Sequence, residues 1–278
     1  MRLLGAAFIA AAVSVGANTA DANLATHRFD AHGAMRWIRI QLSYGPRPAG
    51  SATSRALADR LHAALPHSAF QPVPGGLRNI IARVPGRDST DVVVVGAHYD
   101  TKDIPGFVGA NDGAAGTAAV MELARHLPPR LLRPTIVFAL FDGEESPDDT
   151  PDSEFEQKGL RGSKVAAPTF KDARAMILLD FIGVRNVRLP REESSDPDLW
   201  AELRASARRV GAEAAFPPGV GPDVLDDHTP FEDVGVPSID LIDFHYPCFH
   251  KLCDDLSQVS ERSLNEVGET VRDLLPRL

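Results

Sequence analysis

The chain has 278 residues, 44% of them hydrophobic, and a formal net charge of −9 at pH 7. A chain of this length and apolar content can bury a large core, and α/β proteins of this size often form a single domain. The acidic balance and the lack of a basic run argue against a nucleic-acid or anionic-membrane partner and fit an acidic enzyme surface.

The first residues have the pattern of a secretory signal peptide. Arg2 precedes an apolar stretch that reaches Val15, and Ala20-Asp21-Ala22 fits the small-x-small pattern of a cleavage site. The apolar stretch is shorter than the roughly 20 residues that a membrane span needs, and no other segment is long enough. We predict a signal peptide over residues 1–22, a catalytic domain over residues 23–278, and a secreted or periplasmic mature protein.

After the signal, hydrophobic periodicity predicts helices that alternate with short apolar strands. Gly75-Gly76 separates the first two strands, which favours an antiparallel hairpin at a sheet edge, whereas the later strands are continuous apolar runs typical of buried parallel strands. The fold class is therefore α/β, a single doubly wound, mostly parallel sheet with helices on both faces. Predicted helices cover residues 30–42, 51–65, 117–127, 162–167, 198–210 and 260–275, and predicted strands cover 69–73, 79–84, 91–97, 135–141, 175–179 and 237–242.

Two features concern the loops. Residues 146–156 are acidic and contain two prolines, which predicts an exposed loop that shapes substrate access. Cys248 and Cys253 lie close together, and export to an oxidising compartment would favour a short-loop disulfide between them. From the sequence alone, two free thiols are an equal alternative.

Polar side chains stand just past the ends of the predicted strands or at a helix entrance. Glu144 and Glu145 are adjacent like charges, whose repulsion and desolvation favour a cation nearby. Taken singly, a strand-end acid often caps a helix and a lone histidine often satisfies a core hydrogen bond. Together they predict one site, because ligands of parallel sheets gather at the strands' carboxyl ends, and imidazole and carboxylate suit Zn²⁺. The residues are His98, Asp112, Glu144, Glu145, Asp180 and His250.

An ordered set of motifs resembles the zinc aminopeptidase and glutaminyl cyclase family, from about Asn79 to the C-terminus. The motifs are His98-Tyr-Asp100, Gly109-Ala-Asn-Asp-Gly113, Asp142-Gly-Glu-Glu145, Leu179-Asp-Phe-Ile-Gly183, and His250 followed by Asp254-Asp255. The resemblance implies a zinc-exopeptidase fold. In the aminopeptidases the matching residues hold two zinc ions, Asp112 bridging them, and Glu144 matches the general base. The ligand positions are His98, Asp112, Glu145, Asp180 and His250.

Several stretches resemble the glutaminyl cyclase branch more closely, including Phe107-Val-Gly-Ala110 and Asp226-Asp-His-Thr-Pro-Phe231. That branch implies one zinc on the residues matching Asp112, Glu145 and His250, with Glu144, Asp180 and Asp226 handling protons. Cyclases generally carry tryptophan before the last ligand and in the loop after the glutamate pair. Phe249 and, at best, Phe155 stand there in this chain, and we predict that they contact substrate.

The predicted function is that of a secreted glutaminyl-peptide cyclotransferase with one Zn²⁺, which converts an N-terminal Gln to pyroglutamate and releases ammonia. The alternative is an aminopeptidase with two Zn²⁺, and a third interpretation is a binding protein that kept the fold without the chemistry. An intact Glu144 argues against the third, and the lack of a Gly-x-Ser-x-Gly elbow argues against a serine hydrolase. The expected partners are peptide or protein N-termini, with no nucleic acid and no membrane span.

Overall fold

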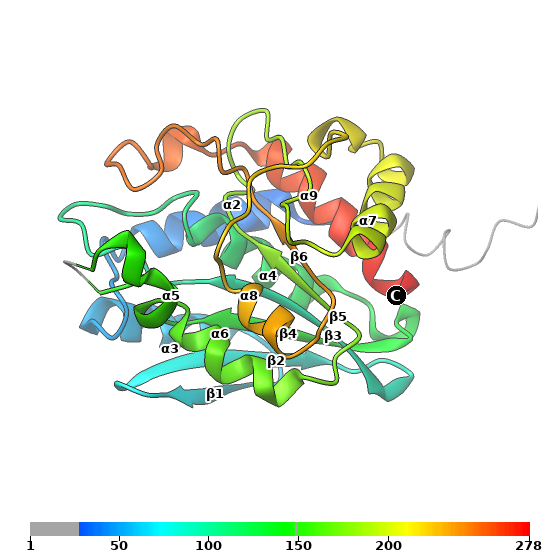
Figure 1. Cartoon of the computed structure of the whole chain (residues 1–278), viewed down its shortest axis with the longest axis horizontal. Helices are drawn as coiled ribbons and strands as arrows, with labels where there is room; N and C mark the ends of the chain where they lie inside the picture. The colour runs from blue at the N-terminus through cyan, green and yellow to red at the C-terminus, as the bar shows by residue number, and fades with distance from the viewer. Residues whose placement is uncertain (1–27, 148–149) are drawn as a thin grey trace, which may run out of the picture.

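The computed structural model describes residues 28–147 and 150–278, so the predicted signal peptide and its cleavage site lie outside the described residues. The described part is built on a six-stranded sheet in the order β1-β2-β4-β3-β5-β6 (Figure 1). The strands are β1 (Ser68–Val73), β2 (Leu77–Val84), β3 (Asp88–His98), β4 (Pro134–Phe141), β5 (Ala175–Leu179) and β6 (Ser238–Leu241).

The sheet is mostly parallel, as predicted. Strands β4, β3, β5 and β6 run parallel to one another, whereas β1 and β2 form an antiparallel hairpin and β2 pairs antiparallel with β4. Gly75 and Gly76 make the hairpin turn, with φ of 83° and 78° in the left-handed region that favours glycine. The four parallel strands therefore deliver the residues that follow them to one edge of the sheet.

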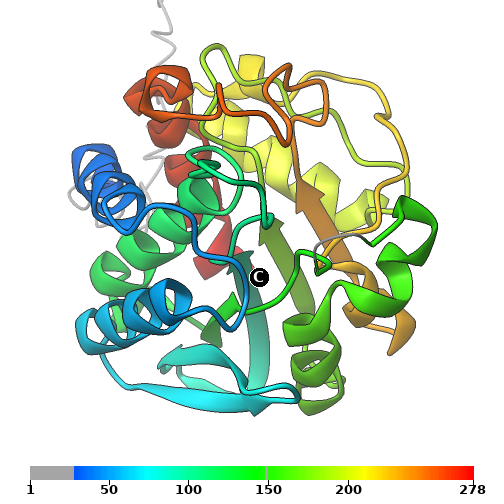
Figure 2. The same cartoon turned by 90° about the vertical axis from the view of Figure 1, so that its left-hand side faces the viewer.

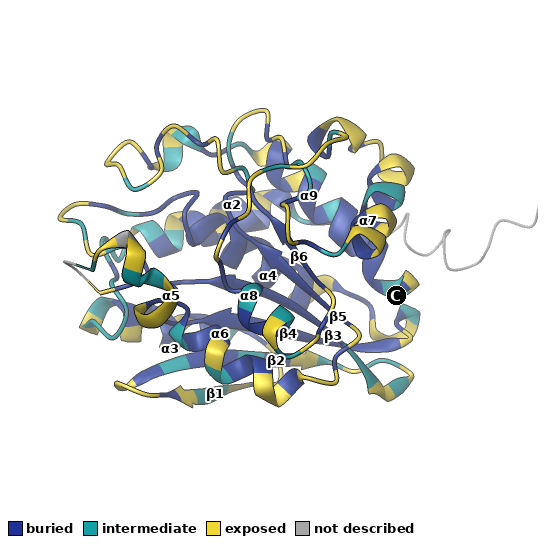
Figure 3. Cartoon of the chain, viewed as in Figure 1, coloured by how far each residue is buried: buried dark blue, intermediate teal, exposed yellow. Residues whose placement is uncertain are grey.

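Alternating side chains of the strands feed two separate cores, one on each face. Val93 and Val95 of β3 pack with one set of helices, while Val94 between them packs with Phe170 and Phe231 on the opposite face. Because both faces are covered, the central strands are buried along most of their length (Figure 3). This arrangement confirms the predicted doubly wound α/β fold.

The larger helical layer consists of five helices, and the other face carries shorter ones (Figure 2). The larger layer contains α2 (Ala31–Leu42), α3 (Ala52–Ala64), α4 (Ala114–His126), α7 (Pro197–Val210) and α9 (Glu261–Leu274). The other helices are α5 (Phe155–Lys158), α6 (Arg161–Ala166) and α8 (Thr229–Asp233). Short 3-10 turns cover Pro129–Leu131, Asp152–Glu154, Ala167–Phe170, Glu213–Ala215, Leu256–Gln258 and Leu275–Arg277. Within the described ranges, no helix has both the length and the apolar character needed to cross a membrane.

Local chemistry explains where several helices begin. The Ser51 and Ser260 hydroxyls accept N–H bonds from Ser54 and Ser263, as expected of N-caps. Helix α4 starts at Ala114, earlier than the predicted Thr117. The sequence did not reveal this start because the N-cap is Gly113, which has no side chain that could cap the helix. Its third residue, Gly116, lies so close to β5 that a Cβ there would be 2.0 Å from the Leu179 carbonyl oxygen.

The structure departs from the sequence-based expectation in two short segments. The predicted loop 146–156 is not wholly exposed or irregular: Ser146 is buried, and the segment ends in a 3-10 turn and the start of α5. A Glu154–Lys158 ion pair at i,i+4 spacing supports that helix. Helix α8 was not predicted, because five residues are too few for a hydrophobic period to be recognised.

Candidate metal centre

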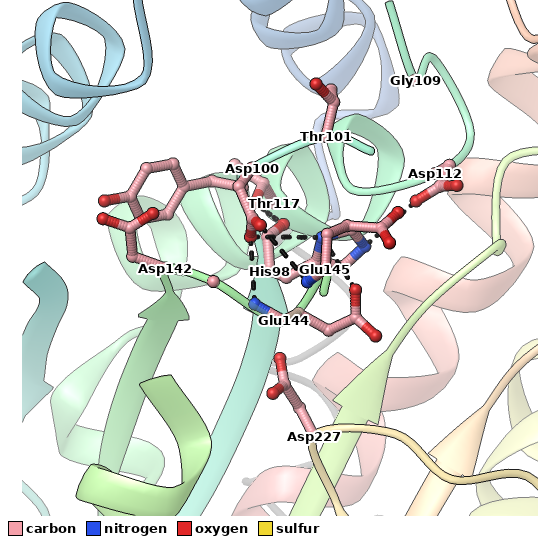
Figure 4. A network of polar contacts seen from close by, with 12 residues as sticks. His98, Asp100, Thr101, Gly109, Asp112, Thr117, Asp142, Glu144, Glu145 and Asp227 are labelled. Atoms are coloured by element: carbon pink, nitrogen blue, oxygen red, sulfur yellow. Dashed lines mark hydrogen bonds and ion pairs between the residues drawn. The ribbon is translucent and has the colours of Figure 1, made fainter. Parts of the chain in front are cut away.

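Two groups of potential metal ligands meet at the carboxyl edge of the sheet and share one aspartate. Figure 4 shows His98, Asp112 and Glu145 of these groups beside Glu144. In each group the ligand atoms lie within 4.8 Å of one another. The first group contains His98, Asp112 and Asp180, and the second contains Asp112, Glu145 and His250. All of them had been predicted as ligands from the sequence, and the fold brings them together from segments far apart in the chain.

His98 ends β3 and lies inside the first group, only 2% exposed. Its Nε2 is 3.3 Å from Asp112 Oδ1 and 3.5 Å from Asp180 Oδ1. Its Nδ1 faces the opposite way, 3.7 Å from Asp100 Oδ1 and 3.9 Å from Glu144 Oε2. The imidazole is thus surrounded by four carboxylates, which raise the pKa of His98 well above its usual value even though burial opposes the charge.

The second group is more open to solvent. His250 Nε2 lies 3.1 Å from Glu145 Oε1 and 3.5 Å from Asp112 Oδ2. Lys102 Nζ lies 3.3 Å from Glu145 Oε2 and donates a hydrogen bond to the Ser146 hydroxyl. Burial raises the pKa of Glu145, but the bond and charge of His250 and the charge of Lys102 outweigh it and hold this pKa below its usual value.

Asp254 fixes the loop that presents Asp112. Its carboxylate accepts the backbone N–H groups of Asn111 at 2.8 Å and Asp112 at 3.1 Å, and the Tyr246 hydroxyl at 2.7 Å. The loop before α4 is therefore tied to the loop that carries His250. Two of the second group's three ligands are held in register by this one carboxylate.

Asp100 fixes the backbone of the glutamate pair, Glu144 and Glu145. Its two oxygens accept the backbone N–H groups of Glu144 and Glu145, each at 3.3 Å, across the turn that Gly143 makes with a φ of +80°. The fully buried Arg47 donates to the carbonyl oxygens of Tyr99 and Gly109 and so fixes both ends of the intervening loop. These contacts hold the site's loops rigidly on the sheet.

The buried acids repel one another. Burial, and next the charge of Glu145, raise the pKa of Asp112 to about 7 and the pKa of Glu144 well above its usual value. Burial, and next the charge of Asp180, raise the pKa of Asp226 to about 7. Each of these carboxyls would be more easily ionised beside a cation.

The donor set fits zinc. Asp112 Oδ2, which faces His250 Nε2, is buried and lacks a hydrogen-bond partner, so the site has an unsatisfied ligand atom of a kind that zinc binds. Histidine and carboxylate ligands with no cysteine match catalytic rather than structural zinc sites. The Asp112, Glu145 and His250 group also borders the cavity, so a metal held there would be open to substrate.

A cavity of about 480 Å³ opens beside the second group. Its floor is acidic, with Glu144, Asp180 and Asp226 on it, and much of its wall is apolar. Phe249 stacks on the His250 ring with centroids 3.9 Å apart, and Phe155 also lines the cavity. Both predicted aromatic positions therefore border the space where a substrate would lie.

The cavity brings together nearly all of the predicted site residues, and His98 lies just behind it against Asp112 and Asp180. Sequence reasoning had not given a role to several cavity residues, including Lys102, Phe181 and Asp223, nor to the loop-holding Arg47. Asp100 and Asp254 occur in the motifs but had been given no role there. Their position close to predicted ligands in the sequence was the one signal that could have indicated a role for them.

A buried His and carboxylate centre at the carboxyl ends of a mostly parallel, doubly wound sheet is the architecture of the zinc exopeptidases. The chain belongs to Peptidase family M28, whose profile matches residues 79–275. The family is enzymatic, and its zinc metalloprotease members imply zinc as the metal.

Relatives with different activities resemble the chain to similar degrees. A probable zinc metalloprotease of Leptosphaeria maculans is 29% identical over 73% of this chain, aminopeptidase YwaD of Bacillus subtilis 25% over 65%, and the glutaminyl-peptide cyclotransferase of Bos taurus 27% over 65%. These matches cover 54%, 40% and 60% of the relatives' own lengths. The chain thus spans about half the length of these curated relatives.

Solved structures match over nearly their full length. The glutaminyl cyclase of an Acidobacteriales bacterium has a TM-score of 0.77 and 28% identity, covering 97% of this chain and 98% of that one. The Fimbriiglobus ruber glutaminyl cyclase has a TM-score of 0.77 and 27% identity, covering 90% and 96%. A leucine aminopeptidase precursor from Bacteroides thetaiotaomicron, with a TM-score of 0.79 and 24% identity over 90% and 98%, shares the fold.

Cys248 and Cys253 form a disulfide with their Cα atoms 5.5 Å apart, and the loop that it closes contains His250. His250 has a φ of +50°, a conformation that only a well-constrained non-glycine residue keeps. The disulfide therefore constrains the loop that presents this predicted metal ligand.

We expect reduction of this disulfide to weaken zinc binding by about tenfold, the scale seen when a group that orients a metal ligand is removed. The free energy of unfolding should fall by at most about 2 kcal/mol, because the closed loop is short. Zinc titration and urea unfolding, each with and without reductant, measure the two effects. The double variant Cys248→Ser/Cys253→Ser is the control and should not respond to reductant. Equal zinc affinity in oxidised and reduced protein would contradict the expectation.

Proposed function

We propose that this protein is a glutaminyl-peptide cyclotransferase that acts on peptide N-termini outside the cytoplasm, with one zinc ion. The observation that carries the proposal is the position of Asp226. Its carboxyl is 3% exposed and lines the same cavity as Glu144 and Asp180, so three buried carboxyls face the space beside the ligands. The disulfide in the ligand loop supports export, since such bonds persist in oxidising compartments.

In the proposed reaction the α-amine nitrogen of an N-terminal Gln attacks the carbon of its own γ-amide. The new C–N bond closes a five-membered lactam, and the bond to the amide nitrogen breaks to release ammonia. Glu144 accepts a proton from the attacking amine and delivers it to the departing nitrogen. Because attack is intramolecular, holding the side chain folded in the cavity supplies much of the rate.

Asp112, Glu145 and His250 would hold the zinc, which would polarise the γ-amide carbonyl when bound. Burial and the nearby charge of Asp180 raise the pKa of Asp226 to about 7, and a protonated Asp226 would donate a hydrogen bond to the substrate. Phe249 and Phe155 bound the cavity and would enclose the folded side chain. Several of the similar solved structures, including two with 27% and 28% identity, are glutaminyl cyclases, which also supports the proposal.

One observation favours an aminopeptidase instead. The group of His98, Asp112 and Asp180 is compact enough to hold a second metal and shares Asp112 with the first group. In that case Glu144 would take a proton from an attacking water and pass it to the leaving amine. The two activities differ in nucleophile and in metal number, so an activity assay and a count of bound metal ions can tell them apart.

The direct test compares two activities of the zinc-loaded protein. We expect ammonia release from an N-terminal glutaminyl peptide and little or no amine release from aminoacyl chromogenic substrates. An N-terminal pyroglutamyl peptide is the control and should release no ammonia. Amine release without ammonia release would replace the cyclotransferase by the aminopeptidase, and a metal-free protein with neither activity would reject both.

Adjacent glutamates should respond differently to the same substitution. Glu144→Gln should keep zinc and lower kcat by about 10² or more, because a general base is removed while the ligands remain. Glu145→Gln should lose zinc as well as activity, because a neutral amide is a poorer zinc ligand than a carboxylate. Metal analysis and steady-state kinetics on both variants separate the roles. Equal zinc occupancy in the two would contradict the division.

Replacing His98 by Ala tests the number of metals. We expect one zinc per chain both before and after Ala replaces His98, with a modest loss of activity, because the proposed zinc uses only the second group. A dinuclear site would instead fall from two metals towards one as the imidazole is removed. Metal stoichiometry by mass spectrometry distinguishes the cases, and two zinc ions in the unmodified protein would contradict our expectation.

A further inference from the structure

Outside the metal centre, a second buried polar cluster is centred on Glu192, which is 1% exposed. Its Oε2 accepts the Ser195 N–H at 2.8 Å and the Ser194 and Ser195 hydroxyls, each at 2.9 Å. Its Oε1 accepts the Ser194 N–H at 2.9 Å and the Val224 N–H at 3.2 Å. One carboxylate thus satisfies three backbone donors from two segments of the chain.

The contact with Val224 connects this cluster to the substrate cavity. Residues 223–226, here called the cavity wall, line the cavity and end in Asp226. Just beyond them, the fully buried His228 places its Nε2 3.5 Å from Glu192 Oε2 and 3.1 Å from the Ser194 hydroxyl. Glu192 therefore contacts the chain two residues before Asp226 and two residues after it.

The charges in the cluster favour an ion pair. Burial opposes ionisation of Glu192, yet the bonds from His228 and Ser194 hold its pKa at about 2. Burial likewise opposes a charge on His228, but the bond with Glu192 and the charges of Asp226 and Glu232 raise its pKa. On its other side His228 Nδ1 lies 3.8 Å from the buried Asp240. A buried charge pair with this many donors is costly to disturb from either side.

We propose that Glu192 is a positioning residue that sets the place of Asp226 in the cavity by holding the chain on both sides of it, at Val224 in the cavity wall and at His228 just beyond the wall. The proposal rests on the function proposed above, in which Asp226 handles a proton. Glu192 touches neither the cavity nor the ligands, so it acts through the wall alone. If Glu192 served only to fold its own turn, its contacts with Ser194 and Ser195 would suffice. Glu192 also contacts residues more than thirty positions away along the chain.

Glu192→Gln tests this with almost no change in shape. Both carboxylate oxygens accept backbone N–H groups, so an amide nitrogen in either place would face a donor and break one of those bonds. The neighbouring Glu193 is exposed, and Glu193→Gln is the matched control with the same change of charge. We expect Glu192→Gln to lower kcat by roughly 10- to 100-fold, as small misplacements of reacting groups do, and Glu193→Gln to leave it unchanged.

Two further measurements separate positioning from general damage. Zinc stoichiometry should stay the same in Glu192→Gln, since the proposed ligands come from other segments. Amide hydrogen exchange at residues 224–228 should become faster in Glu192→Gln but not in Glu193→Gln, and this readout does not depend on activity. Most of the kinetic loss should be in kcat rather than KM, because other apolar residues also form the cavity.

An unchanged kcat in a folded Glu192→Gln protein, unaltered exchange at 224–228, or loss of zinc together with activity would each overturn the proposal. If Glu192→Gln does not fold, Ser194→Ala decides, because it removes one exposed hydroxyl from the cluster. That variant should lower kcat by a few fold with zinc retained, and wild-type turnover would reject the proposal. If the unmodified protein has neither activity, the proposed function fails, while the exchange experiment still decides whether Glu192 holds the wall.

Discussion

Gathering Asp112, Glu145 and Asp180 in one buried space costs free energy twice, through lost hydration and through mutual repulsion. The surrounding structure offsets part of this cost with the cations of Arg47 and Lys102, both placed on loops at the edge of the sheet. The charge of Asp112 in turn helps Arg47 to keep its proton at full burial, although burial lowers its pKa to about 10. A divalent cation would offset much of the remaining free-energy cost. A cluster of buried acids that is unfavourable on its own is therefore typical of a metal site.

Carboxylates also hold the loops of the site in place. Three acids outside the predicted ligand set each accept two or more backbone N–H groups. Asp100 binds the glutamate pair, Asp254 binds the loop before α4, and Glu192 binds its own turn and the cavity wall. A carboxylate that accepts several backbone N–H bonds fixes the segments that supply them. The chemistry-bearing side chains can then sit on loops without the looseness that loops usually have.

Strand-end residues such as His98 and Asp180 could be predicted because an apolar run that stops at a polar residue reveals both the strand and its carboxyl end. All the strands of the sheet were predicted from short apolar runs and most helices from hydrophobic periodicity, with boundaries in error by a few residues. Arg47 and Glu192 could not be predicted, since their partners lie 52 and 32 residues away and are backbone atoms rather than distinctive side chains. The start of α4 was misplaced because a glycine N-cap carries no sequence signal.

Asp180 has two uses that exclude each other. Beside His98 and Asp112 it completes a set of ligands for a second cation, which requires it to be ionised and to face that group. Beside Asp226, which lines the same cavity, its charge adds to the effect of burial and raises the pKa of Asp226 to about 7, so that Asp226 can carry a proton. A second cation bound at Asp180 would offset that charge and favour loss of the Asp226 proton, which the proposed cyclotransferase reaction would use as a hydrogen-bond donor.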